Sequence, residues 1–403
     1  MSLVKASVPW DWGTRQKHMV LHFPVSEYRD RIAKVRREME ERGLTHLIAY
    51  SNFADPADVR WLSGFNTSHG DSFVVIAPDR EPALVTNWIM HDEPMHSEIW
   101  TSWMEDTRAC PPFSNSLIDE VAAAAKADGD PRPGRIGLSG QRVMPARILT
   151  PLLQACGLES FANGDAVTAA ARRIKSPLEI EMVRRASRAA GAGIGAALAA
   201  LEPGVTEQAA TSIAHGTMFA AGAEQLAFES SFSSGGARAG MKHCTPSWKP
   251  FEAGDAVFID MGAIVHGYYS DVSRCAAVGE PSPELRRLLA AGEVLFEELV
   301  KLAKPGRSFA DLHEDAIRIA RDLGYEKYYM PGGFGHGVGC MLFERPSLRY
   351  RETTDILEVG MTFAFEPMFV QYGVGTAVVE DTMLVTEKGI EPLSGLPTKV
   401  YAG

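Results

Sequence analysis

The sequence predicts two domains, an α/β domain over residues 1–170 and an α+β domain over residues 171–403. The first observation is the length of 403 residues, which exceeds the usual size of one domain. The second is an alternation of apolar strands and amphipathic helices that ends before residues 164–175. The third is a β-rich C-terminal region in which one hairpin pattern occurs twice. This repeat predicts a second domain built from two related halves.

The elements of the first domain follow from this alternation. Apolar residues recur at helical spacing from Tyr28 to Met39, so residues 27–42 are expected to form a helix that ends at Gly43. Short apolar runs separated by turn residues predict strands. After an irregular arm at 1–25, we expect strands at 47–50, 73–77, 82–86 and 135–139, a helical turn at 56–62, and helices at 116–127 and 144–155.

The second domain follows a boundary at residues 164–175. Ser176 and Glu179 form a predicted capping box around Pro177, which starts a long helix that ends near Leu201. Thr206 is expected to cap the helix that follows. We then expect helices at 207–221, 283–302 and 308–323, a strand at 226–233, a hairpin at 258–274, and β-structure at 332–339, 362–367 and 376–386.

The hairpin at 258–274 carries an acidic residue in each strand. Asp260 follows the apolar run Val-Phe-Ile, and Asp271 lies in the return strand after a turn at His266-Gly267. A carboxylate inside an apolar strand is costly to bury without a cation or another partner. One interpretation is a solvated face of the hairpin. The other is that both carboxylates point into a metal site.

The same pattern recurs near the C-terminus. In both copies the first carboxylate, Asp260 or Glu366, follows a turn glycine by six positions at the inner end of an apolar strand. The second carboxylate, Asp271 or Glu380, lies on the return strand. Four carboxylates are therefore expected to converge. His336 lies between glycines that would let backbone approach a ligand, which makes it a fifth candidate, with a flexible loop as the alternative.

These five residues have the composition of a two-metal site. Adjacent carboxylates raise each other's pKa, and divalent cations remove that repulsion. Oxygen ligands with one imidazole favour manganese, with cobalt, zinc and iron as alternatives. Four carboxylates and one histidine are enough to hold two ions about 3.5–4 Å apart, which activate water and polarise a substrate carbonyl.

Composition argues against several other classes of protein. A net charge of −11 disfavours nucleic acid as a partner. No basic amphipathic helix predicts membrane binding, and the longest near-apolar run, residues 186–201, is too short to span a bilayer. The N-terminus has no predicted signal peptide. The five cysteines form no C-x-x-C pair, which disfavours disulfides and thiolate zinc sites and predicts a reducing cytoplasm.

These residues resemble the creatinase / aminopeptidase P / prolidase family, and the likeness extends over nearly the whole chain. Residues 59–65 are similar to the family's N-terminal domain, and residues 173–180 to its domain junction. Asp260, Asp271, His336, Glu366 and Glu380 match all five of the family's metal positions. The resemblance implies a pita-bread catalytic domain with pseudo-twofold halves, two divalent metal ions and a homodimer.

The resemblance also implies a chemistry. The expected activity is metal-dependent hydrolysis of a C–N bond, as in an Xaa-Pro aminopeptidase or dipeptidase acting on a short peptide. Glu366 would assist as general base, and His243 would stabilise the oxyanion or the leaving group. Candidates for further substrate contacts are Phe343, Glu344, Arg345 and, across a dimer, Phe65, His69, Trp88 and His91. The alternatives are a rim charge for Glu344, a solvated basic loop for Arg345, and core or surface packing for the last four.

Three positions depart from the proline peptidases of the family. Those enzymes carry histidines where this chain has Gly332 and Phe343, and an arginine where it has Val378. The departures favour a second hypothesis, a creatinase- or ectoine-hydrolase-like enzyme that hydrolyses a small nitrogen compound. The five intact metal positions favour the peptidase. They also disfavour a third hypothesis, an inactive binding module.

Overall fold

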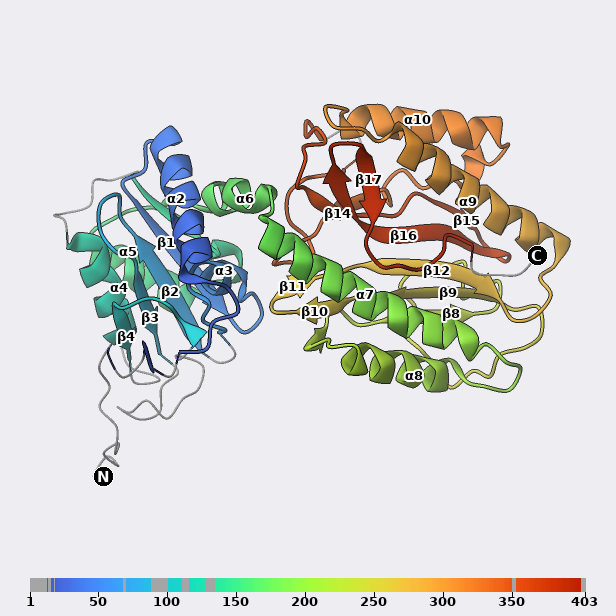
Figure 1. The fold of residues 1–403 in the computed structure, drawn as a ribbon, viewed down its shortest axis with the longest axis horizontal. Coiled ribbons are helices and arrows are strands. Elements are labelled where there is room, and N and C mark those ends of the chain that lie inside the picture. The colour runs from blue at the N-terminus through green and yellow to red at the C-terminus, as the bar shows by residue number, and fades with distance from the viewer. Residues whose placement is uncertain are drawn as a thin grey trace, which may run out of the picture. The chain divides into compact units, whose positions relative to one another are not determined.

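The chain divides into two compact units, Met1–Arg172 and Arg173–Gly403, which are described separately (Figure 1). A computed structural model describes residues 13, 16–17, 19–67, 70–87, 101–110, 116–127, 135–349 and 353–399. Most of the predicted N-terminal arm lies outside these ranges. No helix within them has the length and apolar character needed to cross a lipid bilayer.

In the described part of the first unit, six strands form one mixed sheet in the order β4-β3-β2-β1-β5-β6. The central strand β1 is antiparallel to β2 and parallel to β5. β1, β2 and β3 are buried along their whole length, including the polar residues at their ends. The strands are β1 His46–Asn52, β2 Asp71–Ile76, β3 Ala83–Thr86, β4 Thr107–Ala109, β5 Ile136–Ser139 and β6 Ala162–Asn163.

Helices complete this α/β unit and mostly fall where the sequence predicts them. They are α2 Val25–Glu41, α3 Ala57–Ser63, α4 Ser116–Lys126, α5 Ala146–Cys156 and α6 Asp165–Arg173. α3 ends at Gly64, whose φ of 79° is left-handed and whose Cβ would lie 2.5 Å from the Thr101 carbonyl oxygen. α6 was not predicted, because it occupies the stretch interpreted as a domain boundary.

The second unit is built on antiparallel strands. Its main sheet has the order β13-β14-β16-β12-β9-β8 among the described residues, with β15 and β17 also paired to β16, and a small sheet has the order β11-β10-β7. The strands are β7 Gln225–Leu226, β8 Ser231–Ser234, β9 Ala256–Met261, β10 Ala263–Val265, β11 Tyr268–Tyr269, β12 Val272–Ala277, β13 Gly335–Gly337, β14 Thr362–Phe365, β15 Met368–Gln371, β16 Gly375–Thr386 and β17 Gly389–Pro392.

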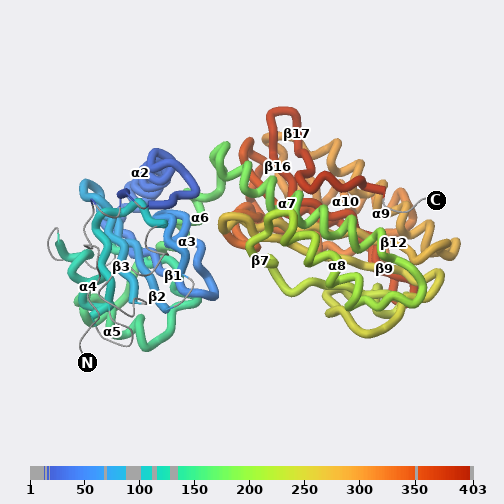
Figure 2. Tube along the Cα trace, turned by 60° about the horizontal axis from the view of Figure 1, so that its bottom comes forward, coloured from blue at the N-terminus to red at the C-terminus, as the bar shows by residue number. Residues whose placement is uncertain are grey.

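Among the described residues of this unit, two helices lie in each of its two halves (Figures 1 and 2). α7 Pro177–Ala199 and α8 Glu207–Ala220 lie side by side, with α7 against β10 and β12. α9 Pro283–Leu302 packs on β15 and β16, and α10 Phe309–Asp322 packs on α9. The Ser176/Glu179 capping box is present, and Thr206 and Ser308 cap α8 and α10 as expected.

The predicted hairpin at 258–274 is broken into two strand pairs. β9 pairs with β12 in the main sheet, while β10 pairs with β11 and with β7 in the small sheet. The break falls at Gly262, where a Cβ would lie 2.1 Å from the Ser270 carbonyl oxygen. The turn falls at His266-Gly267 as predicted, with φ values of 50° and 82°.

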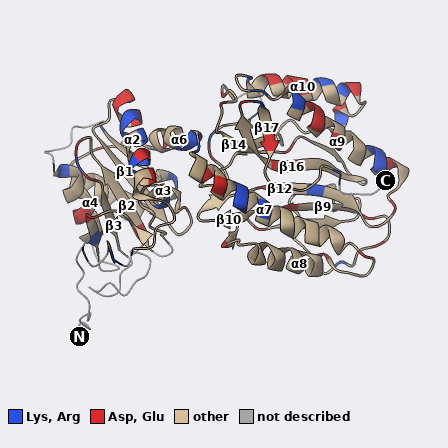
Figure 3. Cartoon of the chain, viewed as in Figure 1, with Lys and Arg blue, Asp and Glu red and all other residues tan. Residues whose placement is uncertain are grey.

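Surface charge and cysteines agree with the composition. Figure 3 shows acidic and basic residues interspersed along α2, α9 and α10. All five cysteines lie in the described ranges and are free, and only Cys244 is not fully buried.

Candidate metal centre

Strand register brings the predicted carboxylates toward one region of the main sheet. Ser273 of β12 pairs with Asp260 of β9 on one side and with Glu380 of β16 on the other. Asp271 precedes Ser273 by two residues and therefore shares the face of its strand. The Asp271 amide donates to Thr382 Oγ1 at 2.9 Å, and the Thr382 hydroxyl donates back to the Asp271 carbonyl at 2.9 Å. These bonds fix β12 against β16.

The C-terminal strands contribute the other two candidates. Glu366 follows β14, and the β15–β16 pairing, with Met368 opposite Val378, continues toward a position where Glu366 faces Glu380. His336 lies on β13 opposite Ala364 of β14. The turn that joins β15 and β16 contains Gly373, which has a φ of 84°.

Three of the five side chains form a compact ligand cluster. One ligand atom each from Asp271, His336 and Glu380 lies within 4.8 Å of the other two. His336 Nε2 lies 3.2 Å from Asp271 Oδ2. Asp260 is 6% exposed, and its Oδ1, like Asp271 Oδ1, is buried without a hydrogen-bond partner among the described residues. Oxygen atoms in this position fit a bound cation.

The electrostatics of the cluster also fit a cation. Burial and the neighbouring Glu366 carboxylate raise the pKa of Asp260 to about 6. Burial, then repulsion from Asp260, holds the pKa of Asp271 well above its usual range. Burial and repulsion from Asp271 do the same to the pKa of Glu380. These carboxyl groups therefore resist being ionised all at once. A bound divalent cation offsets the repulsion between them.

Glu366 has a partner that the sequence did not indicate. Lys242 Nζ donates to Glu366 Oε2 at 3.0 Å, and the two side chains are only 15% and 16% exposed. Burial opposes the charge on this amine, but attraction to Glu366 and Glu380 outweighs it and raises the pKa of Lys242. The one feature of the sequence that could have indicated a role for Lys242 is its position directly before His243.

His243 lies at the edge of the cluster. Its Nδ1 is 4.0 Å from Asp260 Oδ2, and its side chain is 70% exposed. Partial desolvation of the ring and the charge of Lys242 lower the pKa of His243, which favours a neutral imidazole at pH 7.

The loop that carries Lys242 and His243, residues 235–249, is anchored from α8. The Glu207 carboxylate, fully buried, accepts hydrogen bonds from the amides of Ser234 and Ser247 at 2.7 and 2.9 Å. Arg238 Nη2 donates to the same carboxylate at 2.9 Å. At the other side of the loop, a Cβ on Gly236 would lie 2.2 Å from the Gly373 carbonyl oxygen. The loop is therefore fixed to both halves of the unit.

Phe343, Glu344 and Arg345 have three different environments. Phe343 is 65% exposed, and its ring centroid lies 4.2 Å from that of His336, so it borders the cluster. Glu344 is bound to Lys175 Nζ at 2.6 Å, with side chains only 3% and 2% exposed, so it is not the rim charge considered from the sequence. Arg345 donates to Asp355 at 2.8 Å.

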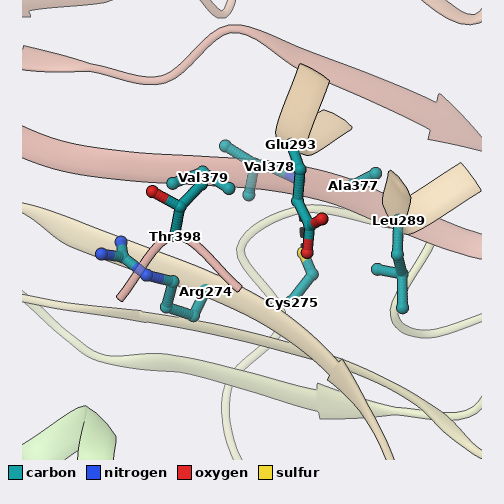
Figure 4. A pocket seen from close by; sticks show the side chains of 8 residues that line it. All are labelled: Arg274, Cys275, Leu289, Glu293, Ala377, Val378, Val379 and Thr398. Atoms are coloured by element: carbon teal, nitrogen blue, oxygen red, sulfur yellow. Dashed lines mark hydrogen bonds between the residues drawn. The ribbon is translucent and has the colours of Figure 1, made fainter. Parts of the chain in front are cut away.

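The positions that depart from the proline peptidases differ in their surroundings. A Cβ on Gly332 would meet open space, so packing does not exclude a larger side chain there. Val378 is 2% exposed and belongs to the apolar core of the unit. It lines a small cavity into which Glu293 of α9 projects toward Cys275 (Figure 4).

Of the four candidates in the first unit, only Phe65 lies in the described residues. Phe65 is 4% exposed and is packed inside its own unit, as the core alternative expected. His69, Trp88 and His91 lie outside the described residues.

Comparison with known families identifies two matching regions. Residues 181–387 match the model of metallopeptidase family M24, and residues 31–174 match the creatinase/prolidase N-terminal domain. An Xaa-Pro dipeptidase of Pyrococcus furiosus is 26% identical over 91% of this chain and 98% of its own length. An Xaa-Pro dipeptidase of Pyrococcus horikoshii is 31% identical over 62% of this chain and 71% of its own length.

Solved structures show the same similarity. An Xaa-Pro dipeptidase from Bacillus anthracis superposes with a TM-score of 0.80 at 25% identity, covering 92% of this chain and 99% of that one. The prolidase from Pyrococcus furiosus gives 0.76 at 26% identity, covering 90% and 99%. Aminopeptidase P from E. coli gives 0.75 at 18% identity, covering 93% and 95%, which bears on the fold alone.

Proposed function

Because this chain belongs to metallopeptidase family M24, we propose that it is a metal-dependent Xaa-Pro dipeptidase. The family match confirms the predicted metallohydrolase, and the structural relatives confirm the predicted pita-bread architecture behind an α/β N-terminal domain. The observation that carries the proposal is the convergence within 4.8 Å of ligand atoms of Asp271, His336 and Glu380, which lie far apart in the sequence.

We assign the metal centre to Asp260, Asp271, His336, Glu366 and Glu380. When bound, two divalent ions would supply Lewis-acid activation of water and of the scissile carbonyl. Manganese is our first choice, since oxygen ligands with one imidazole suit it, and cobalt, zinc and iron are alternatives. We further propose a homodimer in the cytoplasm, supported by the family resemblance and, for the compartment, by the five free cysteines.

The surrounding residues would handle protons and substrate. Glu366 would accept a proton from the attacking water. His243, neutral at pH 7, would donate a hydrogen bond to the developing oxyanion or the leaving group. Phe343 offers an exposed apolar wall beside His336 for a substrate ring. The buried Lys175–Glu344 pair would support the backbone that presents Phe343.

The test combines metal content with a substrate panel. The purified protein should contain divalent metal by elemental analysis and, with Mn²⁺, should hydrolyse Gly-Pro in preference to a longer Xaa-Pro peptide, creatine or ectoine. Activity on creatine or ectoine alone would overturn the dipeptidase assignment while sparing the metal site. Absence of bound metal together with inactivity in Mn²⁺ and Co²⁺ would overturn both.

A matched pair of variants compares a proposed metal ligand with a carboxylate outside the metal centre. Glu380→Gln should lower Gly-Pro hydrolysis by more than about 100-fold, since loss of an outer-shell partner alone typically costs 10–100-fold. It should also reduce bound metal in elemental analysis. Glu391→Gln removes a carboxylate paired with Arg184 at 3.1 Å near the end of β17 and should leave both values unchanged. Equal effects from the two variants would contradict the assignment.

A further inference from the structure

The two halves of the second unit meet where β12 lies beside β16 (Figure 1). β12 pairs with β9 over six residues, and β16 pairs with β14 over four. In the described part of the chain, β12 and β16 pair with each other over only two residues, 273–274 with 379–380. Asp271 comes from one side of this contact and Glu380 from the other. The geometry of the proposed metal centre therefore depends on the register of a short contact.

A buried ion pair crosses this contact on the face of the sheet opposite the proposed ligands. Arg274 and Asp381 each lie one position after a residue on the ligand face, so their side chains point to the other face. Arg274 Nη2 donates to Asp381 Oδ2 at 3.1 Å, and the two side chains are 2% and 0% exposed. Arg274 Nη1 also donates to the Glu380 carbonyl oxygen at 2.5 Å. One guanidinium on β12 therefore binds both the backbone and a side chain of β16.

The same ion pair binds the C-terminal segment 393–397. Two amides of this segment donate to Asp381 Oδ1 at 3.1 and 3.0 Å, and two of its carbonyl oxygens accept from Arg274 at 3.0 and 3.2 Å. The Ser394 hydroxyl donates to Asp381 as well. A Cβ on Gly191 of α7 would lie 2.5 Å from the Ser394 carbonyl oxygen, so α7 packs tightly over the segment. The ion pair is therefore enclosed and joins the backbones of β12, β16 and segment 393–397.

An ion pair this deeply buried is a weak source of net stability, because both charges have been removed from water. Apolar side chains of similar size would fill the same space without that cost. They would not distinguish one register of the strands from the next, since apolar contacts have no direction. The hydrogen bonds of a guanidinium are directional and match a carboxylate and carbonyl oxygens in only one arrangement.

We propose that Arg274 and Asp381 are positioning residues, whose ion pair sets the register between β12 and β16 and so brings the Asp271 and Glu380 carboxylates together. A slip of one residue would turn Glu380 to the opposite face of the sheet. Segment 393–397 takes part by holding both members of the pair in place. This inference rests on the proposed metal centre and concerns its scaffold, whichever substrate the enzyme cleaves.

The test compares Asp381→Asn with the wild type in the full-length protein. The substitution removes the charge and places an amide that can donate where Arg274 needs an acceptor. Mn²⁺ binding, measured by calorimetry, should weaken by about 10–100-fold, as is typical when a residue that orients a metal ligand is lost. The visible absorption bands of the Co²⁺-loaded protein should shift, because they depend on ligand geometry.

Both measurements are made well below the Tm, so they report on folded protein. A variant that was only less stable would therefore match the wild type in Mn²⁺ affinity and in Co²⁺ spectrum. Asp315→Asn is the matched control, because Asp315 pairs with Arg318 of the same helix, α10, at 3.0 Å. It removes a carboxylate from an ion pair outside the β12–β16 contact and should leave both readouts unchanged.

Arg274→Lys serves if Asp381→Asn does not fold, as judged by circular dichroism. An ammonium has no planar fork and cannot bind Asp381, the Glu380 carbonyl and segment 393–397 at once. Arg274→Lys should therefore weaken Mn²⁺ binding in the same range.

Two results would overturn the inference. If the folded variant has a lower Tm but the wild-type Mn²⁺ affinity and Co²⁺ spectrum, the ion pair only stabilises the fold, and the proposed function stands. If the wild-type protein binds neither Mn²⁺ nor Co²⁺, the metal centre fails, and the inference and the proposed function fail with it.

Discussion

At the scale of single residues, Phe343 is where this chain differs most visibly from the proline peptidases it resembles. Its ring contacts His336 at 4.2 Å between centroids while remaining 65% exposed. A phenyl ring donates no hydrogen bond and takes no proton, so it can bind an apolar group but cannot replace a histidine in proton transfer. Its contribution should therefore appear in substrate binding.

We accordingly expect Phe343→Ala to raise KM for Gly-Pro by about 2–10-fold while changing kcat less than about twofold, which is the loss expected for one aromatic contact. Steady-state kinetics at saturating Mn²⁺ measure both values. Phe219→Ala, which removes a 48%-exposed ring from the end of α8, should change neither. A fall in kcat at constant KM would instead place Phe343 in the chemical step.

The four proposed carboxylate ligands were recognisable from the sequence because charged residues inside apolar strands break a local pattern, and His336 was recognisable because it lies between glycines. Lys242 was not, because a lysine in a glycine-rich loop is ordinary until the fold places it 3.0 Å from Glu366. Glu344 shows the same limit. Its partner Lys175 is 169 positions away, so no local pattern reveals that the carboxylate is buried beside the exposed Phe343.

At the scale of elements, the connection between α8 and the 235–249 loop controls the position of Lys242 and His243. Burial disfavours the charged form of Glu207, but hydrogen bonds from Ser247, Arg238 and Ser234 outweigh it and lower its pKa below the ordinary 4.5. A depressed pKa means that the stabilisation is present above pH 4.5 and is lost as pH falls through the folded-state value.

Glu207→Gln should therefore lower the free energy of unfolding by about 2–3 kcal/mol at pH 7, because an amide cannot accept all of these hydrogen bonds. The difference in the free energy of unfolding between the variant and the wild type should become smaller as pH falls below 4.5. Urea unfolding at a series of pH values measures this difference. As a control, Glu202→Gln changes an exposed carboxylate and should stay within about 0.5 kcal/mol of the wild type. A difference that is constant with pH would show that the ionised carboxylate is not the source of the stability.

Most long elements were predictable because their ends carry local signals. The Ser176/Glu179 capping box and the Ser308 cap start α7 and α10 where the sequence indicates. β4 and β6, at three and two residues, are too short to show a period. The break in the 258–274 hairpin depends on Gly262 meeting the Ser270 carbonyl oxygen, a contact set by tertiary structure.

At the scale of the whole molecule, every proposed metal ligand belongs to the unit Arg173–Gly403, and each unit has its own apolar core. Calorimetry should therefore show two unfolding transitions, of which Mn²⁺ raises only one. At a concentration 100 times its dissociation constant, Mn²⁺ adds about 2.7 kcal/mol to the free energy of unfolding. This should raise the Tm of that transition by about 5–10 °C. The isolated segment 173–403 should reproduce the shifted transition, and Glu380→Gln should abolish the shift. If Mn²⁺ raised both transitions equally, the stabilisation would not be confined to the unit that holds the ligands.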